Sequence, residues 1–282
     1  MKVDLCELAK ESRKFRMGPF LETYKKIKKL KKDALYYLTS IYRMATSKKH
    51  TLPDFLVIGA IKGGTTFLRT LLSGHPQILM ALGETDYFNK EYNYKRGELW
   101  YRSHFPLQNE VAVGDLVGEK TPTYLFSLDA AKRIQKDLPN AKLICLLRNP
   151  TERAISNYFM AVKEKKEHLP IMGVMLSEET RRRSYKKRGL YLEQLKRYES
   201  CLKKKQLLIL SSEEFFVNPQ KVLKQVFDFL GVDKTFKCRD LSPRSVASNK
   251  APVPREVYEY LNEYFKPHNQ RLYNYLNRDF GW

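Results

Sequence analysis

A short apolar run followed at once by a glycine-rich turn and a helical pattern constrains this chain more than any other feature. Residues 55–58 form the run, and Gly59-Ala60-Ile61-Lys62-Gly63-Gly64-Thr65-Thr66 leads into a helix expected over 66–73. A strand, a glycine turn and a helix in this order direct backbone N–H groups at an anion. Kinase and ATPase loops need Gly-Lys-Ser/Thr, whereas the lysine here precedes the glycine pair. The pattern therefore predicts an anion site and fits a P-loop kinase poorly.

Two more apolar runs, at 142–147 and 207–210, alternate with helical patterns along the chain. The helices are expected over 128–138, 151–166, 190–204, 219–230 and 254–276. Buried strands that alternate with helices predict an α/β fold with a central parallel sheet flanked by helices on both faces. Ligands of such sheets bind beyond the carboxyl ends of the strands.

A second polar segment follows the run at 142–147. Arg148 ends this expected strand, Pro150-Thr151 begin a helix, and Ser156 lies within that helix. A guanidinium suits bidentate phosphate contact, although an isolated arginine at this place is typical of a capping or salt-bridging residue. A guanidinium and a hydroxyl are therefore expected at the ligand edge of the sheet.

Together the two segments resemble those of the sulfotransferases that use 3′-phosphoadenosine 5′-phosphosulfate (PAPS). The resemblance covers about residues 54–282 and implies a PAPS-dependent enzyme with a P-loop-type three-layer α/β sandwich. It implies that the 5′-phosphosulfate is held by Lys62, Gly63, Gly64, Thr65 and Thr66. The 3′-phosphate would be held by Arg148 and Ser156.

Three further segments resemble the heparan sulfate N- and 3-O-sulfotransferase branch. They are the acidic-aromatic stretch that begins at 84, the Glu-Lys-Thr-Pro-Thr-Tyr motif at 119–124, and the ending at 264–282. The resemblance implies that Glu84 is the general base and that Lys62 and Lys120 stabilise charge during transfer. The rings expected to exclude water from Glu84 are Tyr87, Phe88, Trp100 and Tyr101. From spacing alone, Glu84 would be a solvated carboxylate and Lys120 an ion-pair partner of Glu119.

Some segments depart from that branch. The late Lys-Gly-Arg segment and its disulfide hairpin are missing, and Lys250 is assigned as a nucleotide contact in their place. The phenol and steroid branch uses a histidine base that precedes the 3′-phosphate segment, whereas His168 follows it. His168 is therefore interpreted as a surface residue, and the spacing of the histidines predicts no metal site.

The chain has 52 Lys+Arg and 31 Asp+Glu, a net charge of +21, which favours polyanionic partners. Residues 161–189, with Arg181-Arg182-Arg183 among them, either border the acceptor cleft or form a solvated loop. We expect sulfuryl transfer by in-line displacement to a hydroxyl or amine of a saccharide or glycan, preferably anionic. A glycolipid or another hydroxylated metabolite comes next. The alternatives are a P-loop nucleotide kinase-like enzyme and a non-catalytic polyanion-binding protein, without specific nucleic-acid recognition.

The first fifty residues carry 14 Lys+Arg against 5 Asp+Glu, and apolar residues recur at helical spacing over 20–44. This predicts a basic amphipathic N-terminal extension over 1–50 and a single catalytic domain over 51–282. The helix either packs on the main domain, the preferred interpretation, or contacts an anionic membrane surface peripherally. The four dispersed cysteines and the absence of a signal or spanning segment favour a cytoplasmic protein, peripheral at the inner membrane surface in the second case.

Overall fold

The computed structural model describes residues 40–177, 184–203, 205–238, 240–241 and 252–282. The chain divides into two compact units, Met1–Lys48 and Lys49–Trp282. In the first unit residues 40–45 are helical, and the rest of the helix expected over 20–44 lies outside the described residues. Within the described ranges, no helix is long and apolar enough to cross a membrane.

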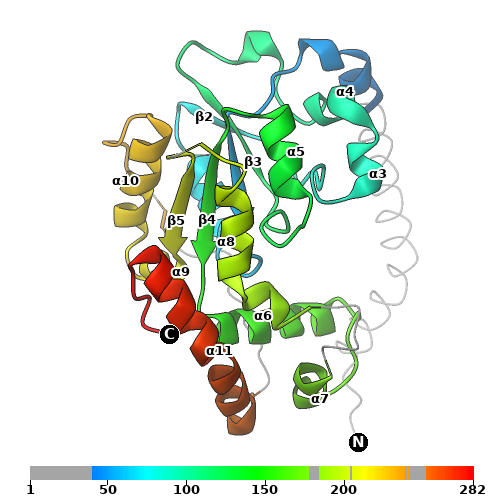
Figure 1. The fold of residues 1–282 in the computed structure, drawn as a ribbon. Helices are drawn as coiled ribbons and strands as arrows, with labels where there is room; N and C mark the ends of the chain where they lie inside the picture. Colours follow the sequence, from blue (N-terminus) through cyan, green and yellow to red (C-terminus); the bar gives the residue numbers. More distant parts are fainter. Residues whose placement is uncertain (1–39, 178–183, 204, 239, 242–251) are drawn as a thin grey trace, which may run out of the picture. The chain divides into compact units, whose positions relative to one another are not determined.

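The second unit is built on a five-stranded sheet in the order β2-β3-β1-β4-β5, in which every neighbouring pair is parallel (Figure 1). The strands are β1 (Phe55–Gly59), β2 (Ile78–Met80), β3 (Leu116–Lys120), β4 (Lys142–Leu147) and β5 (Leu207–Ser211). All five residues of β1 are buried, as expected of a strand covered on both faces. The parallel α/β sheet is thus confirmed.

Helices connect the strands and cover the sheet. The longer helices are α2 (Thr65–Leu72), α5 (Ala130–Asp137), α6 (Pro150–Lys163), α8 (Tyr191–Glu199), α10 (Pro219–Leu230) and α11 (Arg255–Leu276). Short helices are α3 (Glu91–Tyr94), α4 (Gly97–Arg102), α7 (Ile171–Leu176) and α9 (Ser212–Val217), with 3-10 turns at Ser47–Lys49, Gln108–Glu110 and Lys187–Gly189. Each helix expected in the second unit is present, within a few residues of its predicted ends.

Alternating residues of the strands enter two separate cores. Leu56 and Ile58 of β1 pack with residues of α5 and α8, whereas Phe55 and Val57 pack with α2 and α10. Figure 1 shows the strands between α10 and α5. The two cores make this a three-layer sandwich of helices, sheet and helices.

The strand order also fixes where a ligand can bind. From β1 the chain crosses to β2 at one edge of the sheet, whereas from β4 it continues to β5 at the other. Because β1 and β4 are neighbours with connections in opposite directions, the topological switch point lies between their carboxyl ends.

Candidate active site

The carboxyl edge of the sheet gathers one polar residue from each strand. Lys62 follows β1, Glu84 follows β2, Lys120 ends β3, Arg148 follows β4 and Ser212 follows β5. Since all five strands are parallel, these positions meet at one edge, as the arrows of β4 and β5 in Figure 1 show for two of them. Lys62 and Arg148 flank the switch point itself.

The loop after β1 has a backbone that only glycine permits at two positions. A Cβ atom on Gly63 would lie 2.6 Å from the Leu146 carbonyl oxygen, and Gly64 has a φ of +89°. Gly64 is also the N-cap of α2 and provides no side-chain cap. The first N–H groups of α2 have no partner within the helix, so this end of the helix suits an anionic group.

Two side chains from neighbouring strands hold this loop through its carbonyl oxygens. Arg148 Nη1 donates to the Lys62 carbonyl at 3.1 Å, and Ser212 Oγ donates to the Gly63 carbonyl at 2.7 Å. Both carbonyl oxygens accept hydrogen bonds from side chains of the protein. These bonds hold the glycine turn in place at the switch point. Arg148 also approaches Glu152 at 3.4 Å, which orients its guanidinium.

The remaining donor-site residues lie near this loop or on α6. Lys62 Nζ lies 3.8 Å from Met160 Sδ of α6, so the lysine spans from the β1 loop to the helix that follows Arg148. Thr65 and Ser156 are buried, whereas Thr66 is exposed. The turn before α6 is fixed by Asn149, whose side chain accepts hydrogen bonds from the first N–H groups of that helix.

Glu84 and Lys120 form an ion pair. The Lys120 side chain is 7% exposed, whereas that of Glu84 is 43% exposed, so the carboxylate faces solvent and the ammonium lies beneath it. The interpretation that pairs Lys120 with Glu119 is therefore wrong. Successive residues of a strand point to opposite sides, which separates the Lys120 side chain from that of Glu119.

Three of the four aromatic residues expected around Glu84 belong to the buried core, and the fourth, Trp100, is partly buried against it. Tyr87 and Phe88 are buried in the core beside Tyr101, whose hydroxyl donates to Glu119. The carboxylate enclosed by aromatic residues is Glu119, which is fully buried. Burial raises the pKa of Glu119, although the hydroxyl groups that donate to it act in the opposite direction.

The neighbouring carboxylate, Asp86, has a structural role. It accepts hydrogen bonds from Asn89 and Thr123 and pairs with Lys90. Burial alone would raise the pKa of Asp86, but these donors outweigh it and hold the pKa below its usual value. Glu84 is thus the carboxylate of this segment that is both solvent-facing and paired with a lysine from the sheet edge.

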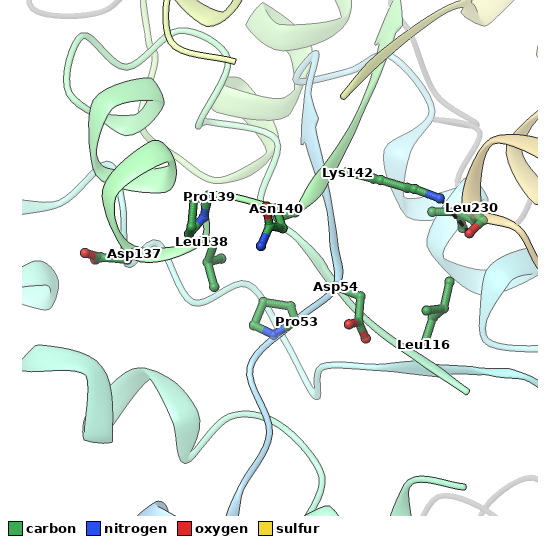
Figure 2. A pocket seen from close by; sticks show the side chains of 10 residues that line it. Pro53, Asp54, Leu116, Asp137, Leu138, Pro139, Asn140, Lys142 and Leu230 are labelled. Carbon is green, nitrogen blue, oxygen red and sulfur yellow. Dashed lines mark hydrogen bonds between the residues drawn. The ribbon is translucent and has the colours of Figure 1, made fainter. Parts of the chain in front are cut away.

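A cavity of about 370 Å³ lies at the opposite edge of the sheet (Figure 2). Its lining includes Asp54, just before β1, and Lys142, at the start of β4. Asp54 accepts a hydrogen bond from the Val117 N–H, and Lys142 Nζ donates to the Leu230 carbonyl. Both of these charged groups bind the backbone, and the cavity lies away from the predicted site residues.

Several predicted residues fall outside this cluster. His168 is exposed, in agreement with its interpretation as a surface residue. Lys250 and Arg181-Arg182-Arg183 lie outside the described residues. Lys186, from the same basic segment, is buried, and its Nζ donates to the Tyr260 hydroxyl at 2.7 Å. The interpretation of residues 161–189 as a solvated loop is therefore wrong for Lys186.

Sequence reasoning missed the contribution of β5. Ser212 contacts the glycine loop, and Glu213 Oε1 accepts the Asn149 N–H at 2.8 Å. The two residues therefore join the loops that follow β1 and β4. The sequence feature that indicates this contribution is Ser211-Ser212-Glu213, which directly follows the third apolar run. Residues at that position lie at the carboxyl end of a strand, where parallel sheets bind ligands.

Comparison with known proteins finds one protein family over most of the chain. The model of the sulfotransferase domain family matches residues 52–251. Human heparan sulfate glucosamine 3-O-sulfotransferase 6 is 30% identical, over 83% of this chain and 75% of its own length. The membrane-associated sulfotransferase kil1 of Dictyostelium discoideum is 29% identical over 82% of this chain, a match that spans 66% of that protein. The crystal structure of a sulfotransferase from Alicyclobacillus acidocaldarius superposes with a TM-score of 0.68, is 29% identical, and covers 82% of this chain and 98% of its own.

Proposed function

Because this chain belongs to the sulfotransferase family, we propose that it transfers a sulfuryl group from PAPS to a hydroxyl or amine of a saccharide. The observation that carries the proposal is the grouping at one sheet edge of three cations, from β1, β3 and β4, with a solvent-facing carboxylate from β2. Cations suit the phosphates and the sulfuryl group of such a donor, and a carboxylate suits proton removal from an acceptor.

The donor site in this proposal lies at the switch point. The glycine loop and the uncapped start of α2 would receive the 5′-phosphosulfate, with Lys62, Gly63, Gly64, Thr65 and Thr66 as the contacts. Arg148 and Ser156 would receive the 3′-phosphate. The fit rests on the uncapped helix, whose first N–H groups can donate to an anion, and on the two glycines, which allow the turn that leads into it. Lys250 stays a prediction, since it lies outside the described residues.

The proposed transfer is an in-line displacement at sulfur. Glu84 accepts the proton of the acceptor group while its oxygen or nitrogen forms a bond to sulfur. The bond between sulfur and the bridging oxygen of the 5′-phosphate breaks, and adenosine 3′,5′-bisphosphate (PAP) leaves. Lys62 stabilises the charge that grows on the bridging oxygen, and Lys120, directly beneath Glu84, stabilises the sulfuryl oxygens.

A saccharide acceptor, preferably anionic, has two kinds of support. The human relative is named for glucosamine units of heparan sulfate, and this chain carries a net charge of +21. A positive field raises the local concentration of an anionic glycan. A glycolipid or another hydroxylated metabolite is the next acceptor class. Transfer of labelled sulfate from PAPS to each class of acceptor distinguishes them.

The N-terminal extension over 1–50, beside a catalytic domain over 51–282, stays a proposal. Its basic composition suits peripheral contact with an anionic membrane, and one relative is named membrane-associated. A cytoplasmic location is likewise a proposal, which rests on the dispersed cysteines.

Thermal unfolding with three nucleotides tests the donor. At about 100 times its Kd, PAP should add about 2.7 kcal/mol to the free energy of unfolding, which raises Tm by about 5–10 °C. AMP, which lacks the 3′-phosphate, should raise Tm much less because the Arg148 contact is lost, and ATP should do no better. An equal shift with ATP would instead support the kinase-like alternative. No shift with any nucleotide would support a polyanion-binding protein.

A further inference from the structure

The Glu119 carboxylate is surrounded by hydroxyl groups from three parts of the chain. Its Oε1 accepts hydrogen bonds from Thr85 Oγ1 at 2.6 Å, Thr121 Oγ1 at 2.7 Å and the Tyr124 hydroxyl at 2.7 Å. Its Oε2 accepts one from the Tyr101 hydroxyl. We call these four donors the hydroxyl cage.

Burial of the Glu119 carboxylate in this cage carries a free-energy cost for its charged form. Glu119 has no solvent exposure, and among the described residues no cation pairs with it, because neighbouring Lys120 pairs with Glu84. Burial without an ionic partner penalises the charged form, and the hydroxyl donors offset this only in part. Stability alone would favour an apolar side chain at this position.

The hydroxyl cage fixes the segment that carries Glu84. Thr85, the next residue, donates to Glu119, and its carbonyl accepts a hydrogen bond from Asn93 Nδ2 at 2.9 Å. The Tyr87 N–H donates to Thr85 Oγ1 and to the Tyr124 hydroxyl. The Thr85 side chain, next to Glu84, and the Tyr87 N–H, two residues further on, are therefore held by Glu119 or by groups that donate to Glu119.

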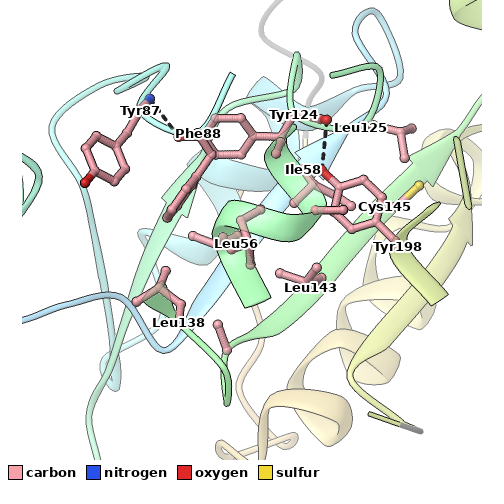
Figure 3. Close-up of a cluster of buried hydrophobic side chains, with 14 of the residues drawn as sticks. Leu56, Ile58, Tyr87, Phe88, Tyr124, Leu125, Leu138, Leu143, Cys145 and Tyr198 are labelled. Carbon is pink, nitrogen blue, oxygen red and sulfur yellow. Dashed lines mark hydrogen bonds between the residues drawn. The ribbon is translucent and has the colours of Figure 1, made fainter. Parts of the chain in front are cut away.

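Glu119 also has a fixed place relative to Lys120. The two are consecutive at the end of β3, where Glu119 pairs in register with Leu56 of the central strand. One carboxylate thus ties the loop of Glu84 to the strand end that carries Lys120. Figure 3 shows Tyr124 next to Phe88, with its carbonyl bound by the Tyr198 hydroxyl, so the cage itself is fastened to α8.

We propose that Glu119 is a positioning residue, which holds the Glu84 carboxylate in place beside Lys120 through Thr85. The proposal rests on the proposed function, in which Glu84 removes the acceptor proton. A shift of about 1 Å in a reacting group can cost about 10²-fold in rate, so loss of this tether should reduce turnover without touching the donor site.

Glu119→Gln tests the proposal, because it keeps the shape of the side chain but places an amide group among hydroxyl donors. We expect kcat to fall by about 10- to 100-fold while the Kd for PAP stays within about twofold. Thr85→Val, which removes only the link to the Glu84 loop, should lower kcat in the same way. Tyr158→Phe is the matched control: it removes the hydroxyl of a buried tyrosine that binds the Leu169 carbonyl, outside the hydroxyl cage, so it should lower Tm but not kcat.

A double-mutant cycle separates positioning from general structural support. If Glu119 acts through Glu84, adding Glu119→Gln to Glu84→Gln should lower kcat no further. An unchanged kcat in folded Glu119→Gln and Thr85→Val proteins would overturn the proposal, as would an equal loss in both backgrounds. If Glu119→Gln does not fold, Thr85→Val decides by the same cycle. Failure of the proposed function is distinct, since Glu84→Gln alone would then retain turnover.

Discussion

Replacement of Glu84 with glutamine is expected to lower kcat by about 10²- to 10⁴-fold, the usual contribution of a general base. Glutamine keeps the length and hydrogen-bonding reach of the side chain but cannot accept the acceptor's proton. The side chain is 43% exposed, so the change should leave the fold intact and the Kd for PAP close to that of the unmodified protein. Steady-state kinetics with PAPS, together with PAP titration, measure both quantities.

The matched control for this variant is Glu91→Gln, a nearby exposed glutamate that pairs with Arg133 and Lys95 on the surface. It should keep normal turnover.

Lys120→Ala, which removes the cation beneath Glu84, should also lower kcat, because charge stabilisation is lost. Near-normal turnover in Glu84→Gln would remove it as the base. Asp86 would then be a poor substitute, since its oxygens are already bound by Asn89, Lys90 and Thr123.

Arg148→Ala and Lys62→Ala are each expected to weaken PAP binding by more than tenfold. A hydrogen bond to a charged group contributes about 1.5–3 kcal/mol, and each variant removes a cation at the switch point. Arg148→Ala has a second effect, because its guanidinium also holds the Lys62 carbonyl of the glycine loop. Isothermal titration of each variant with PAP gives the change in Kd.

Lys142→Ala is the matched control for this pair. Lys142 begins the strand that Arg148 follows, so it lies at the opposite edge of the sheet, where it binds the Leu230 carbonyl. Its removal should affect Tm but not the Kd for PAP. Equal PAP affinity in Lys62→Ala, Arg148→Ala and the unmodified protein would refute the donor-site assignment.

The fold was predictable where burial leaves a clear mark on the sequence. The apolar runs of β1, β4 and β5, and the helices between them, define a parallel sheet with ligands at its carboxyl edge. The glycine loop and Arg148 could be assigned from the same pattern, because each directly follows one of these runs. The structure indeed joins them, through the bond from Arg148 to the Lys62 carbonyl.

The other half of the sheet was not predictable in this way. β2 has only three residues, and β3 reads Leu-Val-Gly-Glu-Lys, with two charged residues at its buried end. Neither gives a long apolar run or a regular alternation. The partner of Lys120 and the burial of Glu119 depend on which loop crosses the end of β3, and this is a tertiary contact between segments about 35 residues apart. For the same reason the sequence does not reveal that Tyr101, expected beside Glu84, donates its hydroxyl to Glu119.

Transfer of radioactive sulfate from ³⁵S-labelled PAPS to defined acceptors is the most direct test of the proposed function. The acceptors are desulfated and partly sulfated heparan saccharides, a neutral saccharide, a glycolipid and a simple phenol, with the Glu84→Gln protein as the control. We expect label in a saccharide, more in an anionic one, and about 10²- to 10⁴-fold slower labelling with the variant. Label in the phenol or the glycolipid but in no saccharide, or equal labelling by Glu84→Gln, would contradict the proposed function.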